Sequence, residues 1–329
     1  MERIAVLGAG SWGTALAILL LHNGHDVTLW SHRRSQIEEM RATKKSDKLS
    51  AELPEELKLT CEMEDAARGK DLLVMAVPSV AERETAEKIR QYITNGQKII
   101  TVSKGIEEKT LLSQTDILKE VFKEANIGVL SGPSHAEEVV IGQPTLVVAG
   151  AEDKNLANYV QILFSNENFR VYTSDDVVGI EIGAALKNVL ALAAGMSDGL
   201  GFGDNAKAAL ITRGIKEMRS LSAAMGGREE TLNGLTGIGD LIVTCQSTHS
   251  RNRRAGVYIG QGMAPKEAFE KVQMVVEGAY SAKAARKLGE KFGMELPIVE
   301  KVNQVLFEGK DVKEAVLELM TRDLKAEFV

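Results

Sequence analysis

One lysine lies in an environment where a lysine is uncommon. Lys187 is in the middle of the apolar segment IEIGAALKNVLALAA (residues 180–194), and its neighbours three and four positions away are all glycine, alanine or leucine. On a helix, such a lysine either extends its ammonium group to water or is held in an enclosed site. Enclosure lowers the pKa of an ammonium group, so in the second case Lys187 is a candidate proton donor or acceptor.

Two glycine-rich stretches could bring the backbone close to a ligand. They are Ser131-Gly132-Pro133-Ser134 and the segment GLTGIGD, which ends at Asp240. The carboxylate of Asp240 could orient or polarise a lysine, or it could cap a helix, and the sequence leaves both interpretations open.

The densest basic stretch is Ser250-Arg251-Asn252-Arg253-Arg254. If Ser250 caps a helix, the free amides of that helix and the guanidinium of Arg251 would form an anion site. The alternative is a solvated basic turn.

A glycine motif near the N-terminus predicts a dinucleotide site. Residues 8–13 read GAGSWG, which matches G-x-G-x-x-G. The match has the context that the motif requires, because an apolar strand is expected before it (4–7), a helix after it (11–21) and a second strand at 27–30. An ordinary glycine-rich turn is the alternative.

Each residue of the motif then has a physical role. Gly8 permits the tight turn, Gly10 lets the backbone approach a pyrophosphate, and Gly13 lets the helix pack closely on the strand. Ser11 and Trp12 supply amides at the helix N-terminus, where the helix dipole favours phosphate.

The end of the second expected strand indicates which dinucleotide is used. NAD enzymes of this type place an Asp or Glu about 20 residues beyond the glycines, to bind the adenosine ribose. Here the region reads Trp30-Ser31-His32-Arg33-Arg34, with two arginines and no acid. Cations suit a 2′-phosphate, so NADP(H) is favoured and NAD(H) remains possible. Alternatively, Arg33 and Arg34 are solvated residues that open a helix.

Strand and helix patterns alternate in the first half of the chain, and helix patterns alone fill the second. The expected strands are 4–7, 27–30, 57–60, 72–77, 99–102, 127–130, 146–148 and 169–172. The later helices are expected at 177–196, 205–225, 281–292, 298–307 and 312–321. This order predicts an α/β, Rossmann-like, doubly wound N-terminal domain (1–175) followed by an all-α C-terminal domain (176–329). Asp175 or Asp176 is expected to cap the first long helix.

Composition excludes several classes of protein. The 329 residues carry a net charge of −6, so no overall basic field would recruit nucleic acid or an anionic membrane. Cys61 and Cys245 are far apart and no metal-like spacing is present, so we expect no metal. We expect no targeting signal and no membrane span, the apolar stretch 12–21 being too short. A cytoplasmic protein is the expectation, with a homodimer possible through the helical half.

Together these motifs resemble one family. In order they are GAGSWGTALA, SKGIE, SGPSHAEEV, IGAALKNVLALAAGMSDGLGFGDNAKAALITRG, LTGIGDLIVTC, SRNRRAG and VEG. The combination resembles the NAD(P)-dependent glycerol-3-phosphate dehydrogenases of bacterial type, from Ile4 to about Gly278. The resemblance implies reversible NAD(P)H-dependent reduction of dihydroxyacetone phosphate, a small phosphorylated substrate, to sn-glycerol 3-phosphate for glycerophospholipid synthesis.

The resemblance also implies residue roles. Lys187 would be the proton acceptor, acting with Asp240 and Lys104. The implied substrate contacts are Lys104, Gly132, Ser134, Asp240, Ser250, Arg251 and Asn252. The implied cofactor contacts are Ser11, Trp12, Arg33, Lys104, Ala136, Arg251, Val275 and Glu277, to which the glycine motif and the arginine segment add Gly8, Gly10, Gly13, His32 and Arg34. Of these residues, Lys104, Ala136, Val275 and Glu277 rest on the resemblance alone.

Two other interpretations compete with this one. A 6-phosphogluconate or 3-hydroxy-acid dehydrogenase shares the two-domain plan and a lysine on an interdomain helix. A dinucleotide sensor without catalysis would bind cofactor with no turnover, but the apolar surroundings of Lys187 and the basic turn argue against it.

Overall fold

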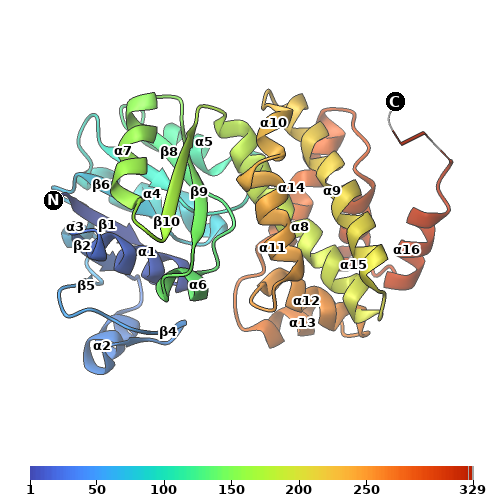
Figure 1. Ribbon diagram of the computed structural model, residues 1–329, viewed down its shortest axis with the longest axis horizontal. Coiled ribbons are helices and arrows are strands. Elements are labelled where there is room, and N and C mark those ends of the chain that lie inside the picture. The colour runs from blue at the N-terminus through green and yellow to red at the C-terminus, as the bar shows by residue number, and fades with distance from the viewer. Residues whose placement is uncertain (325, 328–329) are drawn as a thin grey trace.

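The computed structural model describes residues 1–324 and 326–327 and consists of two parts that lie side by side (Figure 1). One part contains a large sheet with helices around it, and the other is built from helices. All strands of the described chain lie between residues 3 and 174. This confirms the expected fold class, a Rossmann-like N-terminal half followed by a helical C-terminal half.

The large sheet has eight strands in the order β10-β9-β8-β7-β6-β1-β2-β5, and every pairing is parallel except β8 with β9. All eight expected strands are present. Their bounds are β1 (Arg3–Leu7), β2 (Asp26–Trp30), β5 (Lys58–Thr60), β6 (Leu72–Met75), β7 (Lys98–Thr101), β8 (Asn126–Ser131), β9 (Thr145–Ala151) and β10 (Phe169–Ser174). The sequence analysis missed a short antiparallel hairpin of β3 (Lys45–Ser46) and β4 (Leu49–Glu52).

The central strands are buried on both faces, which explains their continuous apolar sequence. Residues 4–7 of β1 and all of β6 are fully inaccessible to solvent. Helices supply the cover. They are α1 (Ser11–His22), α2 (Arg34–Thr43), α3 (Met63–Ala67), α4 (Glu82–Ile89), α5 (Gln114–Val121), α6 (Ala136–Val140) and α7 (Lys154–Phe164).

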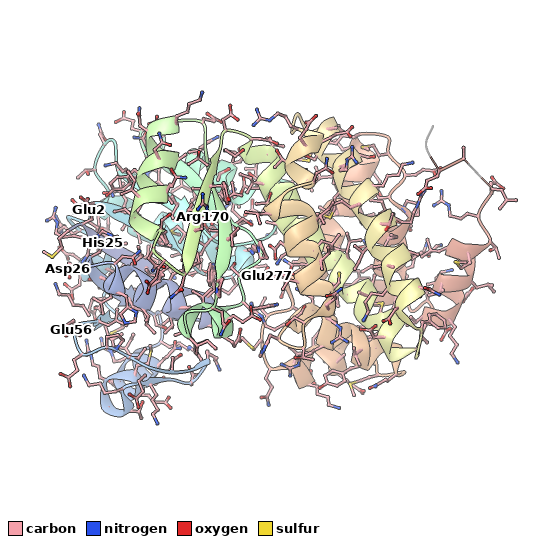
Figure 2. The ribbon with its side chains drawn as sticks, in the orientation of Figure 1. Glu2, His25, Asp26, Glu56, Arg170 and Glu277 are labelled. Atoms are coloured by element: carbon pink, nitrogen blue, oxygen red, sulfur yellow. The ribbon has the colours of Figure 1, made fainter. Side chains whose placement is uncertain are left out.

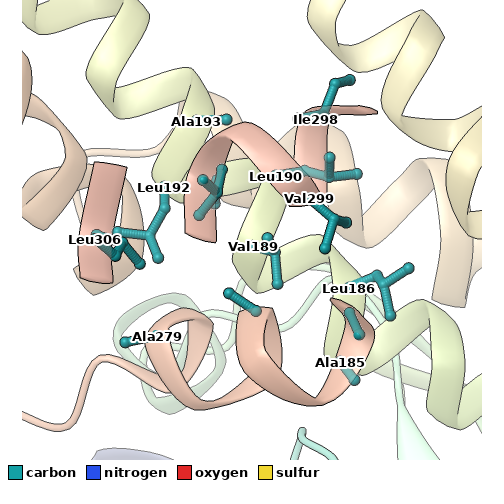
Figure 3. Packing of buried hydrophobic residues seen from close by; sticks show 14 of the residues in the cluster. Ala185, Leu186, Val189, Leu190, Leu192, Ala193, Ala279, Ile298, Val299 and Leu306 are labelled. Atoms are coloured by element: carbon teal, nitrogen blue, oxygen red, sulfur yellow. The ribbon is translucent and has the colours of Figure 1, made fainter. Parts of the chain in front are cut away.

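Helix α8 (Val177–Gly199) is the centre of the second part, and Figure 3 shows its apolar residues packed against the neighbouring helices. Asp176 caps it, because its side chain accepts a hydrogen bond from the amide of Gly179. The other helices are α9 (Asp204–Ala224), α10 (Glu229–Leu232), α11 (Asp240–Gln246), α12 (Arg251–Gly260), α13 (Pro265–Val272), α14 (Glu277–Lys291), α15 (Pro297–Phe307) and α16 (Val312–Met320).

Helix α8 corrects one detail of the sequence analysis. It is a longer apolar helix than residues 12–21, and by length and composition it could cross a membrane. However, 94% of its apolar window is buried inside the protein, as in the core helix of a domain. Its apolar character is therefore explained by the helices that surround it.

Glycines bring α12 very close to α8. A Cβ atom on Gly195 of α8 would lie 2.0 Å from the carbonyl oxygen of Arg253, and one on Gly256 of α12 would lie 2.2 Å from that of Leu192. Any larger residue would push the two helices apart. The close approach places the N-terminus of α12 beside the middle of α8.

We propose that the division into domains falls at residues 175–176, where β10 ends and α8 begins.

Candidate active site

The turn between β1 and α1 has the geometry of a dinucleotide-binding turn. Gly8 has a φ of 129°, and a Cβ atom there would lie 2.4 Å from the carbonyl oxygen of Ala76. A Cβ atom on Gly13 would lie 1.9 Å from the carbonyl oxygen of Gly8. Both positions therefore require glycine, for the turn and for helix packing.

Gly10 differs from these two glycines, because nothing lies within 4 Å of the position that its Cβ would take. Gly10 precedes the first residue of α1, and no side chain caps that helix end. The open backbone at Gly10 and the uncapped amides of Ser11 and Trp12 fit the pyrophosphate of a dinucleotide. The hydroxyl of Ser11 donates to the carbonyl oxygen of Lys48 (2.9 Å), which ties the β3–β4 hairpin to this end of α1.

The two glycines give a matched pair of variants. We expect Gly10→Ala to fold with an unchanged melting temperature and to weaken dinucleotide binding at least tenfold, because its methyl group fills the open approach. Gly13→Ala should lower the melting temperature, because its methyl group clashes with backbone. Thermal unfolding and fluorescence titration with NADPH check both expectations. Unchanged NADPH affinity in Gly10→Ala would contradict the assignment of this turn as the pyrophosphate site.

The side chains of the three residues His32, Arg33 and Arg34, which follow β2, have different partners. The guanidinium of Arg33 donates to the side-chain oxygen of Gln36 (3.1 Å), and that of Arg34 pairs with Glu62 (2.5 Å). His32 lies next to Trp30, with ring centroids 6.3 Å apart. Arg34 is also the first residue of α2, as one of the two interpretations of the sequence expected.

Lys187 is buried, with 6% of its surface exposed. Its ammonium nitrogen lies 2.5 Å from Oδ1 of Asp240 and 2.9 Å from the hydroxyl oxygen of Thr244. The side chain is therefore enclosed and does not extend to bulk water, which decides between the two alternatives that the sequence left open.

Asp240 joins two lysines that are far apart in the chain. It is 1% exposed, and its second carboxylate oxygen, Oδ2, lies 2.8 Å from the ammonium nitrogen of Lys104. Asp240 is the first residue of α11, but the N-cap of that helix is Gly239. The side chain of Asp240 therefore does not cap the helix, and it pairs with the two lysines. Lys104 comes from the loop after β7, and it also donates to the carbonyl oxygen of Gly132 (3.0 Å).

Burial and charge adjust the pKa values of this cluster. Desolvation, with a smaller effect of the Lys104 charge, lowers the pKa of Lys187 to about 8, although the Asp240 carboxylate opposes the shift. Burial would raise the pKa of Asp240, but the two ammonium groups outweigh it and hold that pKa below its usual range. At neutral pH the cluster therefore has one carboxylate between two ammonium groups, and one of these ammonium groups can readily lose a proton.

The segment after β8 brings small residues next to Lys104. The hydroxyl of Ser134 donates to the carbonyl oxygen of Gly132 (3.0 Å), the same oxygen that accepts from Lys104. Gly132 has a φ of 150°, and a Cβ atom there would lie 2.9 Å from the Cα atom of Val147. Ala136 is buried at the first position of α6, a helix that packs on α1.

The basic turn opens a helix, as one interpretation of the sequence required. Ser250 is the N-cap of α12, and its hydroxyl accepts from the amide of Arg253. The side chain of Arg253 pairs with Asp198 (2.7 Å), whereas Arg251 forms no ion pair within residues 1–324 and 326–327. The positive charge of Arg251 is thus available to bind an anion at the helix N-terminus.

Asn252 and Glu277 connect elements of the site in the structure. The side-chain amide of Asn252 donates to Asn188 (2.9 Å) and accepts from the amide of Gly278 (2.9 Å). Glu277, at the start of α14, lies where the two parts of the chain meet (Figure 2) and accepts from the amide (3.1 Å) and the hydroxyl of Ser79. Val275 lies two residues before α14 and is partly exposed.

The structure adds two polar residues that the sequence analysis did not single out. The hydroxyl of Thr244 donates to the carbonyl oxygen of Asp240 (2.6 Å) and accepts a hydrogen bond from the ammonium of Lys187. The side chain of Asn188 donates to the carbonyl oxygen of Lys104 (3.4 Å) and accepts a hydrogen bond from the side-chain amide of Asn252. Thr244 follows Asp240 by four positions, so helical spacing could have indicated it. Asn188 gave no such signal, because its partners are distant in sequence.

This fold and this site define a dehydrogenase of the two-part plan that uses a nicotinamide dinucleotide. The comparisons narrow the class. Residues 3–157 match the family model of the NAD-dependent glycerol-3-phosphate dehydrogenase N-terminus, and residues 176–317 match that of the C-terminus. The chain therefore belongs to the NAD-dependent glycerol-3-phosphate dehydrogenase family.

Individual relatives agree with this family. A glycerol-3-phosphate dehydrogenase [NAD(P)+] of Fusobacterium nucleatum is 54% identical over 100% of this chain and 99% of its own length. One of Agathobacter rectalis is 55% identical over 99% of this chain and 98% of its own length. The crystal structure of glycerol-3-phosphate dehydrogenase from Coxiella burnetii is 37% identical, with a TM-score of 0.95, and the match covers 98% of this chain and 99% of that one.

Proposed function

We propose that this enzyme catalyses the reversible reduction of dihydroxyacetone phosphate to sn-glycerol 3-phosphate with NAD(P)H. The observation that carries the proposal is the buried Lys187–Asp240–Lys104 cluster, in which Asp240 lies within 2.8 Å of both ammonium groups. Two relatives that share more than half of their residues with this chain are named glycerol-3-phosphate dehydrogenase [NAD(P)+], after the product of this reduction.

The chemistry divides between the cofactor and the protein. A nicotinamide dinucleotide, when bound, supplies the hydride or accepts it. During reduction, negative charge develops on the carbonyl oxygen of the substrate, and the ammonium of Lys187, with Lys104 nearby, stabilises that oxygen and protonates it. During oxidation, neutral Lys187 removes the hydroxyl proton. Asp240 keeps both lysines in place and makes the protonated state of Lys187 more favourable.

We assign the remaining site residues from the family resemblance and, for the cofactor, also from the glycine motif and the arginine segment. We assign the substrate to Lys104, Gly132, Ser134, Asp240 and the turn Ser250-Arg251-Asn252. We assign the cofactor to Gly8, Gly10, Ser11, Trp12, Gly13, His32, Arg33, Arg34, Lys104, Ala136, Arg251, Val275 and Glu277. Asn252 and Glu277 would act partly by holding their segments, since their side chains already bond to protein groups.

Arg251 gives a test of the phosphate subsite. We expect Arg251→Ala to raise the KM for dihydroxyacetone phosphate about tenfold to a hundredfold, because a hydrogen bond between charged groups is lost. Turnover of dihydroxyacetone, which has no phosphate, should change much less. Arg254→Ala, in the same helix, is the control. An unaltered KM in Arg251→Ala would remove the anion role.

Several finer points extend the proposal. We propose a preference for NADP(H) over NAD(H) because of Arg33 and Arg34, and a role in glycerophospholipid synthesis because of the family resemblance. A cytoplasmic location fits the two cysteines, which are both free thiols. We also propose a homodimer, formed through the helical half.

One spectrophotometric assay tests the activity directly. We expect oxidation of NADPH, and more slowly of NADH, when dihydroxyacetone phosphate is added, and none with 6-phosphogluconate or 3-hydroxy acids in the reverse reaction with NADP+ or NAD+. Turnover of one of these other substrates alone would replace the proposed function, and cofactor binding without any turnover would indicate a sensor.

A further inference from the structure

Gln36 is a buried polar residue to which neither the motifs nor the resemblance assigns a role. It lies in the first turn of α2 and is 6% exposed. Its side-chain oxygen accepts from the hydroxyl of Ser31 (2.8 Å) and from the guanidinium of Arg33 (3.1 Å). Its side-chain nitrogen donates to the carbonyl oxygen of Ala9 (2.9 Å) and to Asp47 (3.3 Å). Both lone pairs and both N–H groups of the amide are therefore used.

These four contacts connect the segments that surround the adenosine end of a dinucleotide. Ala9 belongs to the glycine turn, which fits the pyrophosphate, and Ser31 and Arg33 follow β2, where the adenosine ribose binds in this fold. Asp47 belongs to the β3–β4 hairpin. Gln36 therefore connects the Arg33 guanidinium to the glycine turn through hydrogen bonds.

The partners of the two arginines differ in charge, and this difference decides which arginine can bind an anion. Arg34 pairs with the carboxylate of Glu62, and both side chains are exposed. An added phosphate would compete with that carboxylate for Arg34. Arg33 is held by a neutral amide oxygen and forms no ion pair among residues 1–324 and 326–327, so no described carboxylate neutralises its charge. A guanidinium that is held in place loses less conformational entropy when it binds a phosphate.

We propose that Gln36 is a positioning residue for cofactor selection, which holds Arg33 where it binds the 2′-phosphate of NADP(H). This inference rests on the proposed preference for NADP(H) and names the residue that produces it. The ligand class is a 2′-phosphorylated adenine dinucleotide, and Gln36 acts on it through Arg33.

Two variants test this role. Gln36→Met removes all four hydrogen bonds with little change in volume, and we expect it to lower kcat/KM for NADPH about tenfold, the scale of one lost charged hydrogen bond. The value for NADH should change less than threefold, and kcat at saturating cofactor should stay the same. Gln36→Glu, which is isosteric, places a carboxylate beside Arg33 and should reduce the NADPH-to-NADH ratio further.

Arg33→Ala provides the second arm of a double-mutant cycle. In the Arg33→Ala background, Gln36→Met should no longer change the NADPH-to-NADH ratio, because the residue it positions is absent. Arg34→Ala is the control and should affect NADPH less than Arg33→Ala. Titration with 2′,5′-ADP against 5′-ADP gives the same comparison as a binding measurement and does not depend on turnover.

The outcomes separate this inference from the proposed function. Equal losses for NADPH and NADH in both Gln36 variants indicate a structural role only and overturn the inference. If Arg33→Ala changes the cofactor preference and the Gln36 variants do not, the inference is wrong and the proposed preference stands. If Arg33→Ala leaves the preference unchanged and Arg34→Ala removes it, the inference is wrong and the preference rests on Arg34. If neither arginine variant changes the preference, the inference and the proposed preference are both wrong. If Gln36→Met does not fold, Gln36→Glu and the nucleotide titration decide.

Discussion

Replacing Lys187 with alanine should lower kcat for reduction of dihydroxyacetone phosphate by roughly 10²–10⁴-fold, the usual contribution of a positioned proton donor. The variant loses the ammonium that stabilises and protonates the substrate oxygen. Affinity for NADPH should be nearly retained, because Lys187 contacts Asp240 and Thr244 and lies outside the glycine turn. Steady-state kinetics and fluorescence titration of NADPH measure the two quantities separately.

Two controls distinguish proton transfer from charge alone. Lys187→Arg keeps a positive charge, but a guanidinium does not give up its proton near neutral pH, so the loss in kcat should persist. A small amine such as methylamine, added to Lys187→Ala, should restore part of the rate by entering the space that the side chain leaves. Wild-type kcat in Lys187→Ala would mean that another group carries out the proton transfer.

Much of the fold could be predicted from the sequence, for physical reasons that particular elements make clear. Strand β6 reads as an unbroken apolar run because helices cover both of its faces, and α8 begins where Asp176 can cap it. The β3–β4 hairpin was missed because its strands are only two and four residues long and Lys45-Ser46 contains no apolar residue. The antiparallel pairing of β8 with β9 depends on long-range register, which local pattern does not determine.

The site was predictable where the chemistry conflicts with its local surroundings. Lys187 among alanines and leucines, the glycines of the turn after β1, and the basic turn at Ser250 all gave such a signal. Lys104 gave none, because its sequence context is an ordinary loop, and only the fold brings it to Asp240. Gln36 was missed for the same reason, because a glutamine in the first turn of a helix is common and its partners lie in three other segments.

Asp240→Asn should have a large effect on both stability and the pH dependence of the reaction. The substitution keeps the shape of the side chain but leaves two ammonium groups close together without a counter-charge. Removing one partner of a buried ion pair costs about 3–5 kcal/mol when the remaining charge is retained. Loss of the proton from Lys187 relieves part of this cost, so the melting temperature should fall most at low pH, where both lysines are charged.

The pH profile gives the sharper test of this assignment. In the wild-type enzyme, reduction requires protonated Lys187, so kcat should fall as pH rises through about 8, and oxidation should increase over the same range. The Asp240 charge raises the pKa of Lys187, so its removal must lower that pKa and shift both limbs to lower pH. Glu314→Gln, an exposed acid on α16, is the charge-matched control and should leave the profile in place. An Asp240→Asn enzyme whose limbs stay at the wild-type pH would show that Asp240 does not set the protonation of Lys187.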